Sequence, residues 1–399
     1  MKSIKHYIYL IILLGFAVSC KVRQTPVDWS LITEEIDNIT LPDSIPEIYI
    51  TQLGDTLLSL ETEVDIPIYR LTKDSITVIG VGDIMMGTNY PEKSLLPLNG
   101  GADLLTDVNS ILRNADITFG NLEGVILNSG GTPKYCSNKN LCFAFRTPES
   151  YISHLKDAGF DVMSTANNHA GDFGDIGRRN TMSVLDSAGI AHAGLLLQPY
   201  TTFKKDGIKY GFAAFAPNTG TQSINNPEEA KAIVQHLDSI SDVVIVSFHG
   251  GAEGSKHQHV TRKREVFYGE NRGNVYEFSH QMIDAGADIV FGHGPHVTRA
   301  MEIYKDRFIA YSLGNFCTYG RFNVQGANGL APIVKLWVNM KGEFLRGYLT
   351  PIKQTKKSGP KIDGNKEVFH YINTLIREDF PEAQLNVADT GEIIHTKNQ

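Results

Sequence analysis

The sequence predicts an α/β protein in which buried strands alternate with amphipathic helices. Apolar runs rich in β-branched and aromatic residues predict strands at 75–82, 115–120, 161–166, 210–217, 242–248, 288–292 and 307–313. Stretches with apolar residues at helical spacing predict helices at 104–115, 149–159, 180–189, 228–240, 275–286 and 366–379. Near-continuous apolar strands that alternate with helices are typical of a sheet covered on its faces.

The composition fits a large globular chain and argues against one class of partner. Of the 399 residues, 42% are hydrophobic and 20% are charged, which is enough for a sizeable core. The net charge is −7, whereas nucleic-acid-binding proteins usually carry a basic surface. We therefore expect no nucleic-acid partner.

Residues 1–20 predict a lipoprotein signal peptide. Two lysines precede the apolar run YIYLIILLGFAVS, which is short for a membrane span. The ending AVSC resembles a bacterial lipobox, so Cys20 is the expected lipidation site. Because Ala17 stands where leucine is commonest, a soluble exported protein stays open. We expect an exported protein that is lipid-anchored to a bacterial membrane and faces the periplasm or the cell surface.

The rest of the chain divides into a tether, a main domain and an extension. Residues 21–72 hold scattered Pro, Asp, Glu and Thr and predict a tether. The main domain is expected at 73–350, and a C-terminal extension with a helix at 351–399.

The cysteines after the signal peptide offer one pair. Cys136 and Cys142 bracket the polar loop CSNKNLC and can form a disulfide in an exported protein. A metal knuckle is the weaker alternative, because no second Cys/His pair lies nearby. Cys317 would be left over.

Polar side chains directly follow most of the predicted strands. Ligands of open α/β sheets bind beyond the carboxyl ends of the strands, and the residues found there are Asp83, Asn121, Glu123, the loop STANNHAGDFG at 164–174, His249, His293, His296 and Asn315. Their carboxylate, amide and imidazole groups suit Mn, Fe or Zn. Two adjacent cations can activate a water and hold a phosphoryl oxygen, while a separate acid protonates the leaving oxygen. The sequence therefore predicts a hydrolytic site with one or two divalent ions.

Six short motifs, taken in order, resemble the metallophosphatase superfamily and, within it, the CapA family linked to poly-γ-glutamate and capsule synthesis. The motifs are GDIMMG, GNLEG, ANNHAGDFG, SFHGGAEG, GHGPHV and YSLGNF, which lie within about residues 75–350. The resemblance implies a calcineurin-like fold, with two central β-sheets packed face to face and flanked by helices. It also implies a metal-assisted site at one edge of the sheets.

The resemblance further implies roles for individual residues. The implied metal ligands are Asp83, Asn121, Glu123, Asn168, His249, His293 and His296. His169 falls at the imidazole position beside the substrate, where it would donate a proton or stabilise developing charge. Asp172 would either orient His169 or cap the following helix.

The chain departs from the superfamily pattern in three places. Met85 stands where the first motif generally has a histidine, and Asn121 and Glu123 stand where a bridging aspartate is usual. Glu123 could bridge through its longer arm, whereas the neutral Asn121 would hold cations less strongly. HGGAEG lacks the aromatic residue that more often follows the histidine, which suggests an altered pocket wall.

Two further groups are candidates for substrate binding. Asn167 and Asn315 stand beside the expected ligands. His257, His259 and Arg262 belong to GSKHQHVTRKR, which is either a solvated basic loop or a lid that recognises an anionic substrate by charge-assisted hydrogen bonds.

Two functions of different classes are therefore expected. The first is a metal-dependent hydrolase that acts on a phosphoester or amide of an anionic envelope polymer, such as poly-γ-glutamate or a capsular polysaccharide. The second is a component that binds such a polymer during assembly or export without turnover. Other capsule-synthesis proteins are expected partners in both cases. The altered first and second motifs favour binding, while His169 and the three strand-end histidines favour catalysis.

Overall fold

The computed structural model describes residues 73–135 and 143–395. The predicted signal peptide, the tether and the Cys136–Cys142 pair lie outside these ranges. Within them, no helix combines the length and the apolar character that a membrane crossing requires. Cys317 is a buried free cysteine, and burial raises its pKa to about 12.

Ten strands form the larger sheet. Along its main path the order is β19 (Leu385–Val387), β20 (Glu392–His395), β17 (Phe344–Lys353), β16 (Leu330–Asn339), β1 (Ser75–Met85), β2 (Ile117–Leu122), β5 (Val162–Ser164) and β6 (Ala191–Ala193). Off this path, β15 (Asn315–Thr318) pairs with β1, and β18 (Lys361–Ile362) pairs with β17. The half from β1 to β6 is parallel and the half from β16 onward is antiparallel.

Six strands form the smaller sheet, which is parallel in its centre. The order is β13 (Met301–Tyr304), β14 (Arg307–Ala310), β12 (Ile289–His293), β9 (Val243–His249), β8 (Ile208–Phe215) and β7 (Tyr200–Lys205). The two edge strands, β13 and β7, pair antiparallel with their neighbours. Two short ribbons lie apart from both sheets and consist of β3 (Val125–Ile126) with β4 (Arg146–Thr147), and β10 (Val266–Phe267) with β11 (Glu270–Asn271).

The two sheets pack face to face through aromatic side chains. Phe119 on β2 stacks on Phe291 on β12, with ring centroids 5.2 Å apart and planes 7° apart. Gly80 on β1 lies under the same ring, because a Cβ there would come within 2.5 Å of Phe291. A glycine therefore allows the close approach of the sheets.

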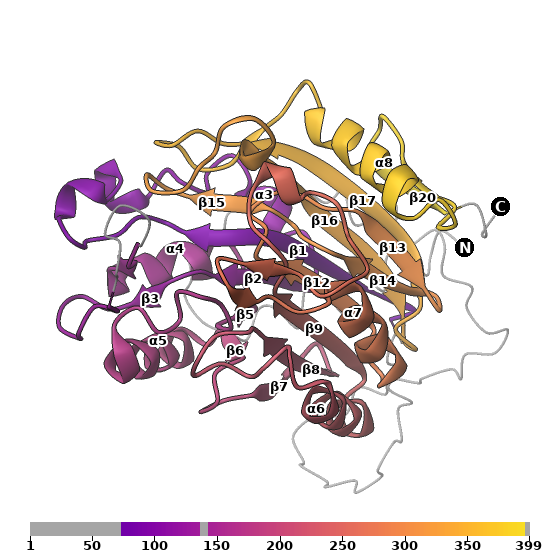
Figure 1. Ribbon diagram of the computed structural model, residues 1–399, viewed down its shortest axis with the longest axis horizontal. Helices are drawn as coiled ribbons and strands as arrows, with labels where there is room; N and C mark the ends of the chain where they lie inside the picture. The colour runs from indigo at the N-terminus through magenta and orange to yellow at the C-terminus, as the bar shows by residue number, and fades with distance from the viewer. Residues whose placement is uncertain (1–72, 136–142, 396–399) are drawn as a thin grey trace, which may run out of the picture. The chain divides into compact units, whose positions relative to one another are not determined.

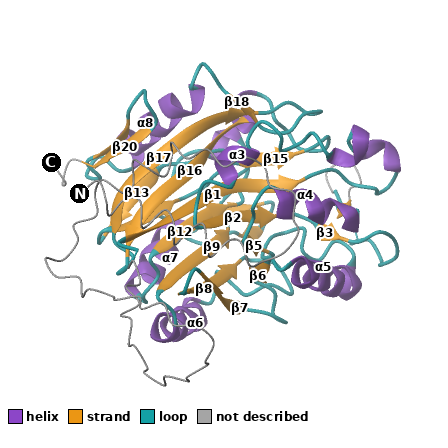
Figure 2. Cartoon of the chain, turned by 180° about the vertical axis from the view of Figure 1, so that it is seen from behind, coloured by secondary structure: helices purple, strands orange, loops and turns teal. Residues whose placement is uncertain are grey.

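Helices cover the outer faces and one edge. The α-helices are α3 (Asn109–Leu112), α4 (Ile152–Asp157), α5 (Gly174–Ala188), α6 (Pro227–Ile240), α7 (Val275–Asp284) and α8 (Glu367–Asp379). Short 3₁₀ helices occur at Lys93–Leu95, Leu98–Gly101, Glu149–Tyr151, Ser255–His257 and Gly326–Gly329. Figures 1 and 2 show α4 and α5 together at one side and α6 and α7 together at another. The helix predicted at 104–115 is mostly turn, with only the four residues of α3 in α-helix.

Buried residues follow the same layers. Leu112, Leu155 and Leu185 of α3, α4 and α5 join one core with the outer face of the larger sheet. Val234 of α6 and Met282 of α7 join a second core with the smaller sheet and the space between the sheets. The layer order is thus helices, sheet, sheet, helices, which confirms the predicted α/β architecture with two central sheets.

The segment after residue 350 adds to the larger sheet. Its predicted helix corresponds to α8, which contacts β16, β17 and β19 and also β13 of the other sheet. Its strands β18, β19 and β20 extend the antiparallel half of the sheet, and the sequence analysis did not predict them.

Candidate metal centre and active site

The register of neighbouring strands gathers the predicted polar residues at one end of both sheets. Asp83 on β1 is paired across the larger sheet with Asn121 on β2 and with Asn315 on β15. In the smaller sheet, His249 on β9 is paired with His293 on β12. Because these strand pairs are parallel, residues that end the strands meet at the same edge.

Asp83 is the centre of the hydrogen bonds in this group and is fully buried. Its Oδ1 accepts a hydrogen bond from Nδ2 of Asn121 at 2.8 Å and lies 3.1 Å from Nδ1 of His293. Its Oδ2 lies 2.8 Å from Nδ1 of His296. His296 has a left-handed backbone with φ 56°, a conformation that is uncommon for non-glycine residues and in which histidine is enriched.

Asp83, Glu123 and His249 could hold a metal ion together. Each places a ligand atom so that all three atoms lie within 4.8 Å of one another. Both carboxylate oxygens of Glu123, both ring nitrogens of His249 and Nε2 of His293 are buried without a hydrogen-bond partner. Buried polar atoms are normally paired, so unpaired ones mark a place for an ion or a water. The donor set fits a divalent cation.

Electrostatics lead to the same conclusion. Burial raises the pKa of Glu123 well above its ordinary value, although the charge of His296 opposes this. Burial also lowers the pKa of His249 well below its ordinary value. For His296, burial alone would lower the pKa, but the carboxylates of Glu123 and Asp83 raise it to about 10. Burial would raise the pKa of Asp83, yet hydrogen bonds with two histidines hold it well below its usual range. Without further positive charge Glu123 therefore favours its protonated form, and a divalent cation would stabilise its carboxylate instead.

The two predicted asparagine ligands differ in their contacts. Asn121 donates from Nδ2 to Asp83, and its Oδ1 accepts from Nδ2 of Asn167 at 3.2 Å. Asn168 lines the adjoining cavity, and its Oδ1 is buried without a partner. The oxygen of Asn168 is therefore the more available ligand.

Met85 supplies no ligand at the position where a histidine is usual. Its side chain packs against Phe145 and Phe322 in a small apolar cluster. Its sulfur accepts a hydrogen bond from the backbone N–H of Gly87 at 3.3 Å. The departure seen in the sequence thus turns a ligand position into a packing position.

His169 and Asp172 form a buried pair at the edge of the metal centre. Nδ1 of His169 lies 2.7 Å from Oδ2 of Asp172. Helix α5 begins at Gly174 with Phe173 as its N-cap and no side-chain cap, so Asp172 orients His169 rather than capping the helix. Lys134 lies 2.6 Å from Oδ1 of Asp172. Burial lowers the pKa of His169, and the charge of Asp172 opposes this shift.

A cavity of about 530 Å³ opens beside these residues. Its lining includes the predicted Asn168, His169 and His296, together with Lys134, Glu253 and Arg321. The last three are not among the residues predicted from the sequence, because each lies in a loop where its chemistry leaves no local signal. Glu253 belongs to the quoted motif SFHGGAEG and pairs with the buried Arg272 at 3.1 Å.

Asn167 and Asn315 lie in the framework below the cavity, and both are buried. Asn167 donates to the backbone oxygen of Leu122 and accepts from the backbone N–H of His169. Nδ2 of Asn315 donates to the backbone oxygens of His296, Asn323 and Asn328. Their substrate-binding role stays a prediction, and the contacts favour a positioning role.

Residues of the basic loop after His249 contact two neighbouring elements, the end of α8 and strand β10. His259 lies 2.8 Å from Oδ1 of Asp379 at the end of α8. The guanidinium of Arg262 lies 4.8 Å from the ring centre of Tyr276, and it also bonds the α8 end. His257 packs against Phe267, with ring centroids 5.8 Å apart. The substrate role predicted for His257, His259 and Arg262 stays a prediction, and the contacts of the last two lead to α8.

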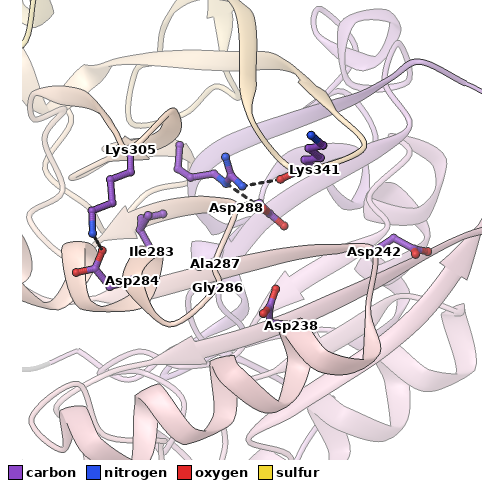
Figure 3. A pocket seen from close by; sticks show the side chains of 10 residues that line it. Asp238, Asp242, Ile283, Asp284, Gly286, Ala287, Asp288, Lys305 and Lys341 are labelled. Atoms are coloured by element: carbon purple, nitrogen blue, oxygen red, sulfur yellow. Dashed lines mark hydrogen bonds and ion pairs between the residues drawn. The ribbon is translucent and has the colours of Figure 1, made fainter.

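A second cavity, of about 400 Å³, lies at the opposite ends of the strands. Asp242 and Asp288 directly precede β9 and β12 there, and Figure 3 shows them with Asp238 and Asp284. Lys305 pairs with Asp284 at 2.6 Å. None of the predicted site residues lines this cavity.

The two face-to-face sheets and the Asp, Asn and His residues at their shared edge define the chain as a metallophosphatase-like α/β protein. A family model described as "Bacterial capsule synthesis protein PGA_cap" matches residues 77–319. The chain belongs to this family of capsule synthesis proteins, which confirms the predicted CapA membership.

Curated relatives agree with this assignment. "Capsule biosynthesis protein CapA" of Bacillus anthracis is 28% identical over 274 residues, which cover 64% of this chain and 62% of the relative. "PGA biosynthesis protein CapA" of Bacillus subtilis (strain 168) is 29% identical over 259 residues, which cover 61% and 63%. The match thus spans slightly less than two thirds of these relatives.

Solved structures show low similarity. A hypothetical protein from Thermus thermophilus matches with a TM-score of 0.43 and 14% identity, over 70% of this chain and 100% of that one. A 5'-nucleotidase precursor from the same organism matches with a TM-score of 0.38 and 12% identity, over 74% and 57%. The layer order and the family membership, by contrast, support the fold assignment directly.

Proposed function

We propose that this chain is a metal-dependent hydrolase that cleaves a phosphoester or an amide in an anionic polymer of capsule or poly-γ-glutamate synthesis. The observation that carries the proposal is the His169–Asp172 pair, which shares a cavity with His296, the hydrogen-bond partner of Asp83 in the Asp83, Glu123 and His249 group. A paired imidazole next to unpaired metal donors has the parts that hydrolysis requires.

In this proposal His169 moves a proton at Nε2. Its Nδ1 is engaged with Asp172, which fixes the ring and leaves the other nitrogen for the reacting group. Asp172 is itself held by the backbone N–H of Phe145 at 2.6 Å and by Lys134. The pair is therefore positioned before the substrate arrives, which lowers the cost of reaching the transition state.

The proposed cofactor is one or two ions of Mn, Fe or Zn. Asp83, Glu123, Asn168, His249 and His293 would hold it, since each has a buried donor atom or belongs to the close group. When bound, such an ion polarises a substrate oxygen and lowers the pKa of a water. The residues of the chain supply the orientation and the proton transfer.

Metal analysis combined with an activity screen tests the proposal. Purified protein is analysed for bound Mn, Fe and Zn after repletion, then assayed with a generic phosphomonoester, a phosphodiester and γ-linked glutamate oligomers. Near-stoichiometric metal with hydrolysis of at least one substrate supports the proposal. Protein that takes up no metal and cleaves nothing contradicts it.

A second candidate function is polymer binding without turnover. It is favoured by Met85, which packs in an apolar cluster instead of offering a ligand, and by Asn121, whose oxygen already has a partner. Both changes weaken the first and second ligand positions. A protein that binds the polymer but takes up no metal would fit this candidate.

We further propose export and lipid anchoring through Cys20, with capsule-synthesis proteins as partners at the membrane. The support is the order of charged, apolar and small residues in the first 20 positions. Stable anchoring requires more than one acyl chain. Globomycin-sensitive processing and labelling with a palmitate analogue test the anchor, and unlabelled protein in the soluble fraction would contradict it.

A further inference from the structure

The cavity beside the metal centre has a continuous aromatic wall. The rings of Phe145 and Phe322 are stacked with centroids 5.2 Å apart, and Phe143 extends the stack outward at 6.4 Å from Phe145. At the inner end, Phe145 lies 4.2 Å from the ring of His169, and Phe322 lies 5.1 Å from that of His296. Phe145 and Phe322 are themselves buried, so they form the backing of the cavity next to the two imidazoles, while Phe143 is partly exposed.

A second pair of aromatic rings lines the same cavity from the β10–β11 ribbon. Phe267 and Tyr268 have ring centroids 4.5 Å apart. The side chain of Tyr268 is 85% exposed, and its backbone is left-handed with φ 47°. The left-handed backbone belongs to the two-residue turn at 268–269 that closes the β10–β11 ribbon, because such a hairpin turn needs positive φ at both positions. The ring of Tyr268 buries little area in the fold and is therefore free to contact a ligand in the cavity.

Charged groups of both signs line the same cavity. Among the described lining residues, Lys134 and Arg321 are cationic, His296 is the cationic imidazole of the metal centre, and Glu253 is anionic. Lys134 pairs with Asp172, and the guanidinium of Arg321 lies 4.9 Å from the ring centre of Phe143. The positive charges thus lie beside the aromatic wall, where they can meet an acidic substituent of a stacked ligand.

We propose that the polymer unit that enters this cavity is a ring sugar with an anionic substituent, not an open-chain γ-glutamyl unit. This inference rests on the proposed function, because it assigns the substrate class of the same site. The C–H face of a sugar ring carries partial positive charge and stacks on the negative face of an aromatic ring. The acidic substituent would meet Lys134 or Arg321, while the bond to be cleaved lies toward His169.

A γ-glutamyl chain matches the cavity less well. Each of its units carries a carboxylate on a flexible chain and has no ring face. A site for it would need a row of cations, whereas the described lining of this cavity has three aromatic side chains that are at least partly exposed, namely Phe143, Phe267 and Tyr268. A volume of about 530 Å³ is in the range of small-molecule sites and can take one substituted ring.

Binding by the full-length protein in detergent tests the inference. Calorimetry compares a hyaluronan oligosaccharide with a γ-linked glutamate oligomer of the same net charge. Tyr268→Phe keeps the ring, Tyr268→Leu removes it, and Tyr348→Leu is the matched control at an exposed tyrosine on β17 outside the cavity. We expect the oligosaccharide to bind more tightly than the glutamate oligomer. Tyr268→Leu should weaken that binding about 3- to 10-fold, and the other two variants should leave it unchanged.

Three results would overturn the inference. They are equal or tighter binding of the glutamate oligomer, no binding of the oligosaccharide, and equal binding by Tyr268→Leu and the wild type. Binding is measured without turnover, so a protein that binds the sugar but hydrolyses nothing would contradict the proposed function and still support this inference.

Discussion

Oδ2 of Asp172 lies 2.7 Å from Nδ1 of His169, and both side chains are buried. The carboxylate is held on its other contacts by Lys134 and by the backbone N–H of Phe145. This arrangement fixes the imidazole ring through Nδ1, so Nε2 is the nitrogen to which the proposed function assigns the proton transfer. A residue that acts through its orientation should be sensitive to the loss of that partner.

Replacing His169 by alanine should lower turnover far more than metal content. We expect a loss on the order of 10²–10⁴-fold in rate, because a proton-transfer group acts mainly in the transition state. Replacing His249 or His293 should lower both quantities. Metal analysis and a phosphodiester assay measure the two effects, with His370→Ala at an exposed position of α8 as the control. Loss of metal in His169→Ala together with retention in His293→Ala would reverse the assigned roles.

Replacing Glu123 by glutamine should weaken metal binding. The carboxylate of Glu123 is fully buried and accepts no hydrogen bond, and Nε2 of His296 lies 3.5 Å from its Oε1. A divalent cation would stabilise this buried charge further. We expect the Glu123→Gln protein to release its metal to a chelator at a lower concentration than the wild type, with a smaller metal-dependent rise in Tm. Glu392→Gln, exposed on β20, is the control. Equal metal retention by both variants would exclude Glu123 as a ligand.

The strand ends could be predicted because strand order and polarity leave a local signal. Asp83 and His249 directly follow apolar runs, and parallel pairing brings such positions to one edge. The aromatic wall could not be predicted, because Phe145 and Phe322 are far apart in sequence and meet only through tertiary packing. The strands β18, β19 and β20 were not predicted for a related reason, since they are two to four residues long and carry little apolar periodicity.

The basic loop shows a further limit of sequence reasoning. Charge alone suggested that Arg262 faces an anionic ligand, but its guanidinium lies between the rings of Tyr276 and Phe380, 4.8 Å from each ring centre. A cation that stacks on aromatic rings and one that binds an anion look the same in sequence. The structure distinguishes these two cases by the position of α8, whose end provides the ring of Phe380.

Replacing Arg299 by alanine should strongly destabilise the fold. Arg299 is fully buried and donates two hydrogen bonds to Glu265, each at 2.8 Å. Removing the guanidinium leaves a buried carboxylate unpaired, which costs about 3–5 kcal/mol. Urea unfolding measures the loss. Lys305→Ala breaks the exposed pair with Asp284 and should leave the free energy of unfolding close to that of the wild type. Similar losses of unfolding free energy in the two variants would show that the buried pair contributes no more to stability than the exposed pair.

Asp288 should make the free energy of unfolding depend on pH below neutrality. Burial raises its pKa from 3.8 to about 6, against the hydrogen bond from Val244 N and the charge of Arg307. Figure 3 shows Asp288 at the second cavity.

The direction of the pH effect on stability follows from which state, folded or unfolded, binds more protons. Between pH of about 4 and about 6 the folded state keeps the proton on Asp288 while the unfolded state loses it. Stability therefore falls as pH rises through this window, by roughly 1.4 kcal/mol for each pH unit, and levels off above it. Asp288→Asn keeps an acceptor for Val244 N but cannot titrate. Urea unfolding across this pH range should show the wild type losing stability relative to Asp288→Asn, while the exposed Asp389→Asn tracks the wild type. A constant difference between wild type and Asp288→Asn at every pH would mean that Asp288 is already ionised throughout.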